Sequence, residues 1–314
     1  MQKLLITGAT GFIGSHLVPR LLKKYKVYAL IRNRDGRKLL PYSSNLIGYY
    51  NTLTNYSEVK RLVAKISPEY VIHLAADFTG VYSYKKYIES LKMNFLSTVN
   101  LIEACRSNSK NLKQFISAGS SDQYGLVPAC YAKNIEETTI ENPNSPYAIS
   151  KSATKLYLKY LYQTYDFPYT FMIPFNTYGR ENDCSFFVES TIMQMLHKRE
   201  VFLGNPDITR DWIYIDDHVD AYLKTLENKK VIGKTIQICT GKGTTTKEIS
   251  EITAKLVKFN GRIHWNSIAS RPIENKVMVG SNKLAKELIG WQPKYSIKDG
   301  IEATIRKLNP NLNF

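Results

Sequence analysis

The sequence contains no long hydrophobic run. No apolar stretch approaches the roughly 18 to 20 residues that a membrane-spanning helix needs. A glycine-rich turn lies where a cleaved signal peptide would have its apolar region, which argues against a secretory leader. We therefore expect no membrane partner.

Cysteine is also scarce. Its spacing argues against a disulfide-rich secreted protein and against a cysteine-based metal site. The chain has four cysteines, with no C-x-x-C pair among them: Cys105, Cys130, Cys184 and Cys239. This pattern indicates reduced thiols and a cytoplasmic location rather than a disulfide-rich secreted fold. The five histidines show no metal-ligand spacing either: His16, His73, His197, His218 and His264. We expect no metal.

Acidic residues are too few to balance the basic ones. The chain has 27 Asp and Glu against 43 Lys and Arg, which gives a formal net charge of +16. The basic residues are dispersed, without a dense stripe or a recognisable nucleic-acid-binding motif. We expect no nucleic-acid partner, because net charge alone promotes encounter with phosphate-bearing ligands but builds no site.

The first stretch with a clear pattern runs from Lys3 to Ser15, KLLITGATGFIGS. An apolar run stops at Thr7-Gly8, and apolar residues at helical spacing follow from Phe12, so the pattern predicts a strand, a glycine turn and a helix. Gly8 permits the turn, Gly11 allows close approach of a pyrophosphate, and Gly14 lets the helix pack on the strand. The expected ligand is a dinucleotide, although this glycine spacing differs from G-x-G-x-x-G.

A second predicted strand, Lys26 to Ile31, ends at Arg32. In a dinucleotide-binding fold this strand end meets the adenosine ribose, where an acid suits a 2′-hydroxyl and an arginine a 2′-phosphate. The next loop carries Asn51 in place of an acid. The cofactor is thus NAD or NADP, and Arg32 slightly favours NADP.

Helices and strands then alternate. We predict a helix from about Tyr56 to Lys65, a strand from Tyr70 to Leu74, a helix from Asn94 to Cys105 and a strand from Gln114 to Ala118. The small Ala75 and Ala76 would let a cofactor lie close to a strand end. The alternation predicts an α/β fold with a Rossmann-type, doubly wound parallel sheet covered on both faces.

Two further segments carry groups suited to hydride chemistry. The polar turn from Gly119 to Gly125 follows a predicted strand, at the sheet edge where ligands of such folds bind. Tyr147 and Lys151 share one helix face, since they are four residues apart. A neighbouring ammonium and a cationic nicotinamide would both favour the phenolate of Tyr147. Ser120 could hold a substrate hydroxyl while Tyr147 takes its proton. A lone Y-x-x-x-K is a frequent accident, but here it follows the glycine and serine turns in order.

These stretches resemble those of the extended short-chain dehydrogenases/reductases that act on nucleotide sugars, and the resemblance spans essentially the whole chain. The matching stretches are TGATGFIG (Thr7 to Gly14), VIHLAA (Val71 to Ala76), MNFLSTVNLIEAC (Met93 to Cys105), SAGSSDQYG (Ser117 to Gly125), SPYAISK (Ser145 to Lys151), PFNTYG (Pro174 to Gly179), LGNPDITRDWIYIDD (Leu203 to Asp217) and RPIENKVMVGSNKLAKELIGWQP (Arg271 to Pro293). The resemblance implies that Ser120, Tyr147 and Lys151 form a catalytic triad, supported by Asn94. It implies cofactor contacts at Gly8, Thr10, Gly11, Phe12, Ile13, Gly14, Arg32, Leu53, Leu74, Ala75, Ala76, Tyr147 and Lys151.

Within this family the second half of the chain is most similar to the GDP-mannose 4,6-dehydratase and GDP-4-keto-6-deoxymannose reductase group. By that likeness Arg210 and Arg271 meet the nucleotide diphosphate and Glu274 meets the ribose. These residue types suit the roles, because guanidinium forks bind phosphate oxygens and carboxylates accept from ribose hydroxyls. Ser121 and Asn176 are expected at the sugar or diphosphate. For each residue a surface ion pair or a structural turn is the alternative.

Asp122 leaves the product open. Dehydratases of this family usually carry a glutamate at this place, which removes the C5 proton of the 4-keto sugar. Aspartate is a competent base but one methylene shorter, so its reach of about 3 Å is in question. A 4,6-dehydratase-like enzyme or a C4 dehydrogenase is expected, with a 4-keto-6-deoxy-sugar reductase or C4 epimerase as alternatives. A cofactor-binding regulatory protein on the same fold is the non-enzymatic alternative.

The length of 314 residues predicts two lobes. We expect a dinucleotide-binding domain from residues 1–179 plus about 213–240, in which 213–215 and 235–239 return to the sheet. A nucleotide-sugar-binding domain would comprise about 180–212 plus 241–314. The resemblance also implies a homodimer or higher homo-oligomer, through helices at about 93–105 and 148–165.

Overall fold

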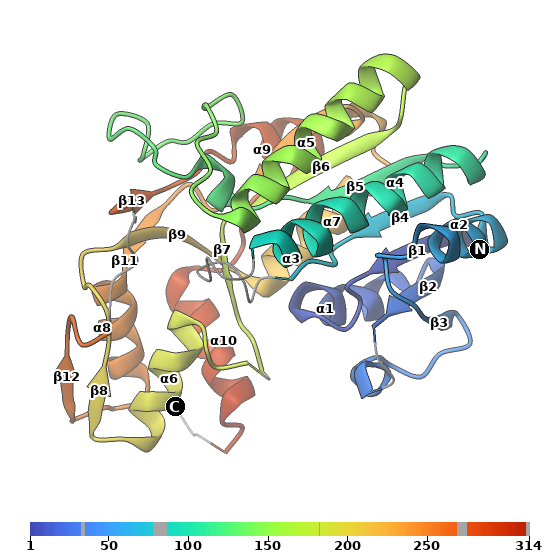
Figure 1. Ribbon diagram of the computed structural model, residues 1–314. Helices are drawn as coiled ribbons and strands as arrows, with labels where there is room; N and C mark the ends of the chain where they lie inside the picture. The colour runs from blue at the N-terminus through green and yellow to red at the C-terminus, as the bar shows by residue number, and fades with distance from the viewer. Residues whose placement is uncertain (33–34, 78–86, 182, 269–274, 312–314) are drawn as a thin grey trace. The chain divides into compact units, whose positions relative to one another are not determined.

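The computed structural model describes residues 1–32, 35–77, 87–181, 183–268 and 275–311, and they form two compact units (Figure 1). The first unit spans Met1–Gly125, Glu141–Ile173 and Ala221–Ile236, and the second spans Leu126–Ile140, Pro174–Asp220 and Gln237–Phe314.

The first unit is built on a seven-stranded sheet in the order β10-β6-β5-β4-β1-β2-β3. Its strands are β1 (Gln2–Thr7), β2 (Tyr25–Ile31), β3 (Leu46–Tyr50), β4 (Tyr70–His73), β5 (Gln114–Ala118), β6 (Tyr169–Pro174) and β10 (Lys234–Ile238). The pairs from β3 through β6 are parallel. The chain leaves β1 in one direction and returns at β4 on its other side, so the switch point lies between β1 and β4. The predicted Rossmann-type fold is confirmed.

Helices connect these strands. They are α1 (Phe12–Leu21), α2 (Tyr56–Ile66), α3 (Tyr87–Leu91), α4 (Ser97–Asn108) and α5 (Pro146–Tyr165), and α7 (Ile215–Thr225) passes from the second unit into the first. Figure 1 shows α4 and α5 side by side on one face of the sheet. The start of α5 is encoded locally: the Ser145 side chain accepts from the Ala148 N–H, and proline occupies the first turn. Short 3₁₀ turns are η1 (Asp35–Leu39), η4 (Ser121–Tyr124) and η5 (Lys229–Val231).

The helix predicted from Asn94 to Cys105 differs in the structure. Lys92–Leu96, labelled η3, forms a π-helical turn, and α4 begins only at Ser97. A π turn inserts an extra residue into the helical repeat and is common at functional sites. Here it buries Asn94, whose exposed fraction is 1%.

The second unit contains a small mixed sheet with helices. Its strands are β7 (Asn176–Tyr178), β9 (Thr209–Tyr214), β11 (Gly243–Thr245) and β13 (Val277–Met278), with a separate pair of β8 (Glu200–Phe202) and β12 (Arg262–His264). Its helices are α6 (Phe187–His197), α8 (Thr246–Leu256), α9 (Lys283–Ile289) and α10 (Ile297–Leu308). Met195, Val201 and Leu203 form a core beneath Phe187 and Trp265.

The unit boundaries differ from the predicted domains. Residues 213–215 were expected to return to the large sheet, but Ile213 and Tyr214 belong to β9, which pairs with β7, β11 and β13. The apolar character of the segment was clear in the sequence, whereas its pairing partners depend on segments more than 30 residues away. Residues 126–140, 174–179 and 237–240 also fall in the second unit.

All four cysteines are free thiols. Within the described ranges no group of histidine, cysteine and acidic side chains is arranged to hold a metal ion. In the same part of the chain, no helix combines the length and apolarity needed to cross a membrane.

Candidate active site

The glycine turn joins β1 to α1 at the carboxyl edge of the sheet. Gly8 has a φ of +70°, and a Cβ there would lie 2.7 Å from the Ala75 backbone nitrogen. A Cβ on Gly14 would lie 2.2 Å from the Gly8 carbonyl oxygen. Gly11 is exposed at the N-cap of α1 and presents no side chain to cover the free N–H groups of the helix. This cradle fits a pyrophosphate, because backbone donors and the helix dipole both favour an anion there.

Buried polar groups connect this turn to the end of β4. Thr7 Oγ1 lies 2.7 Å from His73 Nδ1, and the Ala75 N–H donates to the same Thr7 oxygen at 3.3 Å. The other His73 nitrogen lies 2.7 Å from Thr98 Oγ1. Burial, with a smaller effect from the charge of Lys151, lowers the pKa of His73 to about 3. His73 is therefore neutral, and it links the glycine turn to α4.

The link through His73 is not predicted from the sequence, where His73 only lacks metal-ligand spacing. A histidine ending an apolar strand, directly before Leu74 and Ala75, was the available signal.

Asn94 continues the chain of contacts: its side-chain oxygen accepts from the Asp77 N–H at 2.6 Å, and its amide donates to the Asp77 carbonyl at 2.9 Å. Asn94 thus holds the backbone that follows Ala76.

The serine turn begins where β5 ends. Ser120 caps the short η4 helix, and its Oγ accepts from the Asp122 N–H at 3.2 Å. In return, the Gln123 side-chain oxygen accepts from the Ser120 N–H at 2.9 Å. This reciprocal capping box fixes the backbone of Ser120.

Tyr147 and Lys151 lie buried in the first turns of α5, at exposed fractions of 8% and 4%. The Lys151 ammonium donates to the Ala118 carbonyl at 2.8 Å and lies 5.7 Å from the centre of the Tyr147 ring. Tyr147 also hydrogen-bonds with Ser120. The structure therefore brings together the side chains of Ser120, Tyr147 and Lys151, with Asp122 beside them.

The electrostatics of this group differ from the sequence-based expectation. Burial, together with the charge of Asp122, raises the pKa of the Tyr147 phenol, and the hydrogen bond with Ser120 opposes this only in part. Burial also lowers the pKa of Lys151 to about 8. We expected the Lys151 ammonium to favour the phenolate of Tyr147. In the structure desolvation of Tyr147 has the larger effect, and it favours the neutral phenol.

The remaining predicted cofactor residues surround the same edge. Arg32 is exposed immediately after β2, and Leu53 is buried. Among the other residues of the predicted set Ala76 is exposed, and the rest are half-buried: Thr10, Phe12, Ile13, Leu74 and Ala75. Ser121 is buried next to Ser120.

Two of the predicted nucleotide-sugar contacts, Asn176 and Arg210, belong to the second unit. Asn176 begins β7 and pairs with Trp212 of β9. Arg210, two residues before Trp212 on the same strand, is 7% exposed. Arg210 donates to the carbonyls of Thr209 and Asn275, both at 2.9 Å. Arg271 and Glu274 lie outside the described residues.

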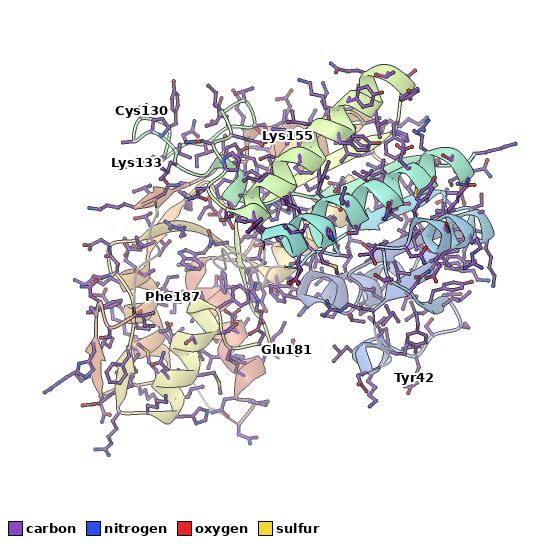
Figure 2. The ribbon with its side chains drawn as sticks, in the orientation of Figure 1. Tyr42, Cys130, Lys133, Lys155, Glu181 and Phe187 are labelled. Carbon is purple, nitrogen blue, oxygen red and sulfur yellow. The ribbon has the colours of Figure 1, made fainter. Side chains whose placement is uncertain are left out.

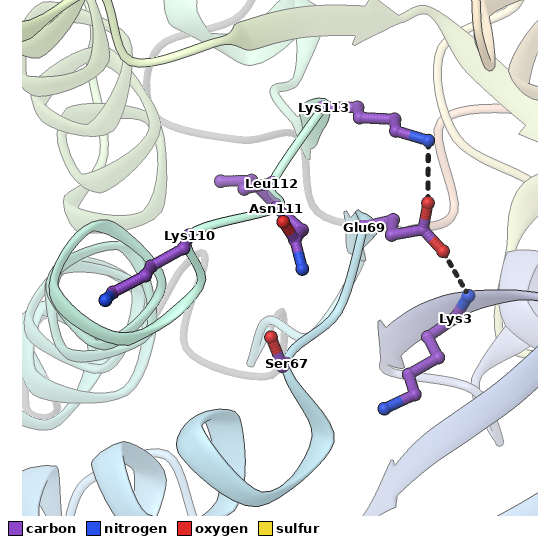
Figure 3. A pocket seen from close by; sticks show the side chains of 7 residues that line it. All are labelled: Lys3, Ser67, Glu69, Lys110, Asn111, Leu112 and Lys113. Atoms are coloured by element: carbon purple, nitrogen blue, oxygen red, sulfur yellow. Dashed lines mark hydrogen bonds and ion pairs between the residues drawn. The ribbon is translucent and has the colours of Figure 1, made fainter.

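A different hollow lies at the amino ends of the strands (Figure 3). Lys3 is at the start of β1, while Glu69 and Lys113 immediately precede β4 and β5. Glu69 accepts from the Lys3 N–H at 3.2 Å and from the Lys113 ammonium at 2.7 Å. No predicted site residue lines this hollow, whose described lining is Lys3, Ser67, Glu69, Lys110, Asn111, Leu112 and Lys113.

Comparison with known proteins decides the family. A family model described as GDP-mannose 4,6 dehydratase matches residues 5–304. The chain belongs to this family. The predicted resemblance is thereby confirmed, and so is the predicted enzyme class of nucleotide-sugar oxidoreductases and dehydratases.

Two relatives and one solved structure show the range of this GDP-mannose 4,6 dehydratase family and its neighbours. The chain is 26% identical to GDP-6-deoxy-D-mannose reductase of Pseudomonas aeruginosa, over 97% of this chain and 96% of that one. It is 30% identical to GDP-mannose 4,6 dehydratase 1 of Arabidopsis thaliana, over 92% and 85%. The crystal structure of UDP-glucuronic acid 4-epimerase from Bacillus cereus, in complex with UDP-glucuronic acid and NAD, is similar with a TM-score of 0.87 and 26% identity, over 98% and 99%.

Proposed function

We propose that this family member catalyses NAD(P)-dependent oxidation and reduction at C4 of a nucleotide-linked sugar, with GDP as the nucleotide. The observation that carries the proposal is the convergence of Ser120, Tyr147 and Lys151 at the edge of the sheet where the glycine turn lies. The cofactor in the complex of the Bacillus cereus neighbour and the names of the relatives support the same chemistry.

In the proposed reaction Tyr147 takes the proton of the C4 hydroxyl, and Ser120 orients that oxygen. Lys151, held by the Ala118 carbonyl, places a positive charge beside the phenol. The chemistry that the nicotinamide supplies when bound is acceptance of the C4 hydride. The glycine turn would hold its pyrophosphate, and the exposed Arg32 favours NADP.

Recognition of the nucleotide sugar is assigned to Ser121, Asn176, Arg210, Arg271 and Glu274. Arg210 is prepared for this role, because its hydrogen bonds to backbone carbonyls orient the guanidinium. Arg271 and Glu274 enter through the resemblance alone.

Asp122 bears on which product is expected. Its charge affects Tyr147, so its carboxylate lies close to the reacting group. A carboxylate there could remove the C5 proton of the 4-keto sugar and lead to loss of the C6 hydroxyl as water. We therefore propose a 4,6-dehydratase-like reaction, or C4 dehydrogenation if the carboxylate falls short. Reduction of a 4-keto-6-deoxy sugar is an alternative, because one relative is named a reductase. Epimerisation at C4 is a further alternative.

The test is to incubate the purified protein with GDP-, UDP-, dTDP- and CDP-hexoses and heptoses, and to record nicotinamide absorbance and product mass. Loss of water indicates dehydration, loss of two hydrogens indicates oxidation, and unchanged mass with a new stereocentre indicates epimerisation. A 4-keto-6-deoxy sugar supplied with NADPH tests reduction. Turnover of none of these substrates would refute the proposal.

The role of Asp122 is tested by Asp122→Asn. If Asp122 is the C5 base, the variant should form the dehydrated product at least about 100-fold more slowly, because an amide cannot accept the proton. Hydride transfer to the nicotinamide should persist, seen as absorbance without loss of water. Asp122→Glu, which restores a carboxylate with longer reach, is the matched control and should keep dehydration. Equal product formation by Asp122→Asn would remove Asp122 from the mechanism.

The proposed assembly is a homodimer through α4 and α5. Along α5, Ile149, Leu156 and Tyr160 are 46%, 66% and 49% exposed, and their spacing of seven and four residues places them on one face. Such an apolar strip suits a second copy of the same helix. Leu156→Arg should give monomers by light scattering, whereas Leu39→Arg, at the similarly exposed Leu39 of η1, should not.

A cytoplasmic location also belongs to the proposal, since all four cysteines are free thiols.

A further inference from the structure

The serine turn is connected to α5 by three side chains that the reaction itself does not use. The Gln123 amide nitrogen donates to Glu141 Oε1 at 3.2 Å, and the Lys155 ammonium donates to the same carboxylate oxygen at 2.7 Å. Lys155 lies on α5, one turn after Lys151 (Figure 2). Gln123, Glu141 and Lys155 thus form a chain of contacts from the backbone of Ser120 to the helix that carries Tyr147.

Gln123 is the central member because its amide contacts one hydrogen-bond donor and one hydrogen-bond acceptor. Its oxygen accepts from the Ser120 N–H, and its nitrogen donates to Glu141. Rotating the amide by half a turn would set its NH₂ against the Ser120 N–H and its oxygen against the carboxylate. Both contacts would be repulsive, so Glu141 fixes the orientation in which Gln123 can hold Ser120. Gln123 is fully buried, so an unsatisfied amide would be costly there.

The local packing is shaped for this arrangement. A Cβ on Gly119 would lie 2.6 Å from the Gln123 side-chain oxygen, so glycine is needed where the amide passes. A Cβ on Gly125 would lie 1.6 Å from the Asn142 carbonyl oxygen, so the end of the serine turn lies directly against the residue after Glu141. The Asn142 N–H also donates to the Tyr124 carbonyl at 3.3 Å.

The Lys155–Glu141 ion pair links α5 to the serine turn through a partly buried contact. Its side chains are only 20% and 16% exposed, so water screens the pair less than it screens a surface ion pair. Lys151 already holds α5 to the end of β5 through the Ala118 carbonyl. Lys155 adds a second attachment one turn along, through Glu141 and Gln123, to the neighbouring Ser120. The two attachments together tie the backbone on both sides of Gly119 to the helix that carries Tyr147.

We propose that Gln123, Glu141 and Lys155 are positioning residues that hold Ser120 in register with Tyr147. The inference rests on the proposed function, since it assigns the three residues to the same catalytic group. In the proposed reaction they touch neither substrate nor cofactor, and they act through the backbone of Ser120.

The test compares Gln123→Met, Glu141→Met and Lys155→Met with the wild-type enzyme. Because small displacements of a catalytic group are costly, we expect Gln123→Met and Glu141→Met to lower kcat by about 10- to 100-fold, with KM changed by less than about 3-fold. Lys155→Met should have a smaller effect in the same direction. Glu141→Gln should recover much of the rate, because its amide oxygen still accepts from Gln123. The double variant Gln123→Met/Glu141→Met should be no slower than Gln123→Met alone.

The matched control is Glu69→Met, which removes an ion pair of the same 2.7 Å length with Lys113 at the opposite edge of the sheet. It should leave kcat unchanged. Hydrogen–deuterium exchange supplies a readout that does not require turnover. In Glu141→Met the amides of residues 117–125 should exchange about 10-fold faster, and in Glu69→Met they should not.

The outcomes separate the two proposals. A lower melting temperature with unchanged kcat and unchanged exchange at 117–125 would overturn the positioning role. Additive effects in the double variant would also contradict it. If the wild-type protein turns over no nucleotide sugar, the proposed function fails, and the exchange measurement still decides whether Glu141 holds the serine turn.

Discussion

Replacing Tyr147 with phenylalanine should lower kcat by about 10³-fold, because phenylalanine has no oxygen to take the proton of the C4 hydroxyl in the proposed reaction. The loss should appear in kcat rather than in cofactor binding, since the aromatic ring remains in place. The substitution removes the hydrogen bond with Ser120 but keeps the buried ring, so the folded protein should persist. Initial rates with the preferred nucleotide sugar, titration with NADPH and thermal unfolding together measure this.

Tyr157→Phe provides a matched control for this result. Tyr157 lies on the same helix, and its hydroxyl donates to Glu103 Oε1 at 2.7 Å, away from the serine turn. It should keep wild-type kcat. A Tyr147→Phe enzyme with full activity would show that the group of Ser120, Tyr147 and Lys151 is not used. Another group would then have to take the proton of the C4 hydroxyl. A wild-type protein that turns over no substrate would instead favour a cofactor-binding regulatory protein.

Gly14→Ala should weaken NAD(P)H binding by about 100-fold or more, since the anion-binding backbone must move to admit a Cβ. The added atom would lie 2.2 Å from the Gly8 carbonyl oxygen and 2.7 Å from the Ala9 Cα. Both neighbours are backbone atoms, which cannot rotate away as a flexible side chain can. We also expect a loss of stability of about 1–3 kcal/mol from overpacking. Fluorescence titration and thermal unfolding measure the two effects.

Gly204→Ala is the control for Gly14→Ala, because a Cβ there has no neighbour within 4 Å. It should bind NAD(P)H like the wild type and unfold at nearly the same temperature. Wild-type binding by Gly14→Ala would mean that α1 can shift without affecting the cofactor. The glycine turn would then not be the pyrophosphate site.

Much of the first unit could be predicted because its signals are local. The glycine turn, the apolar strand before it and the helix after it lie within about 20 residues, and the structure has β1 and α1 there. Ser145 and Pro146 predicted the start of α5, because helix capping is also a local signal. The segment at 213–215 was misplaced because strand pairing depends on partners elsewhere in the chain.

The sequence by itself determined the family, the parallel sheet and the residue types available for catalysis, because glycine conformation, capping and helical spacing act over a few neighbouring residues. Only the tertiary structure decided how those residues are held: the neutral His73 between Thr7 and Thr98, the π turn that buries Asn94, and the attachment of Gln123 to Glu141 and Lys155. The side-chain hydrogen bonds among these join residues 14 to 66 positions apart, and hydrogen-bond geometry over such separations is set by packing, which a pattern of residue types does not specify.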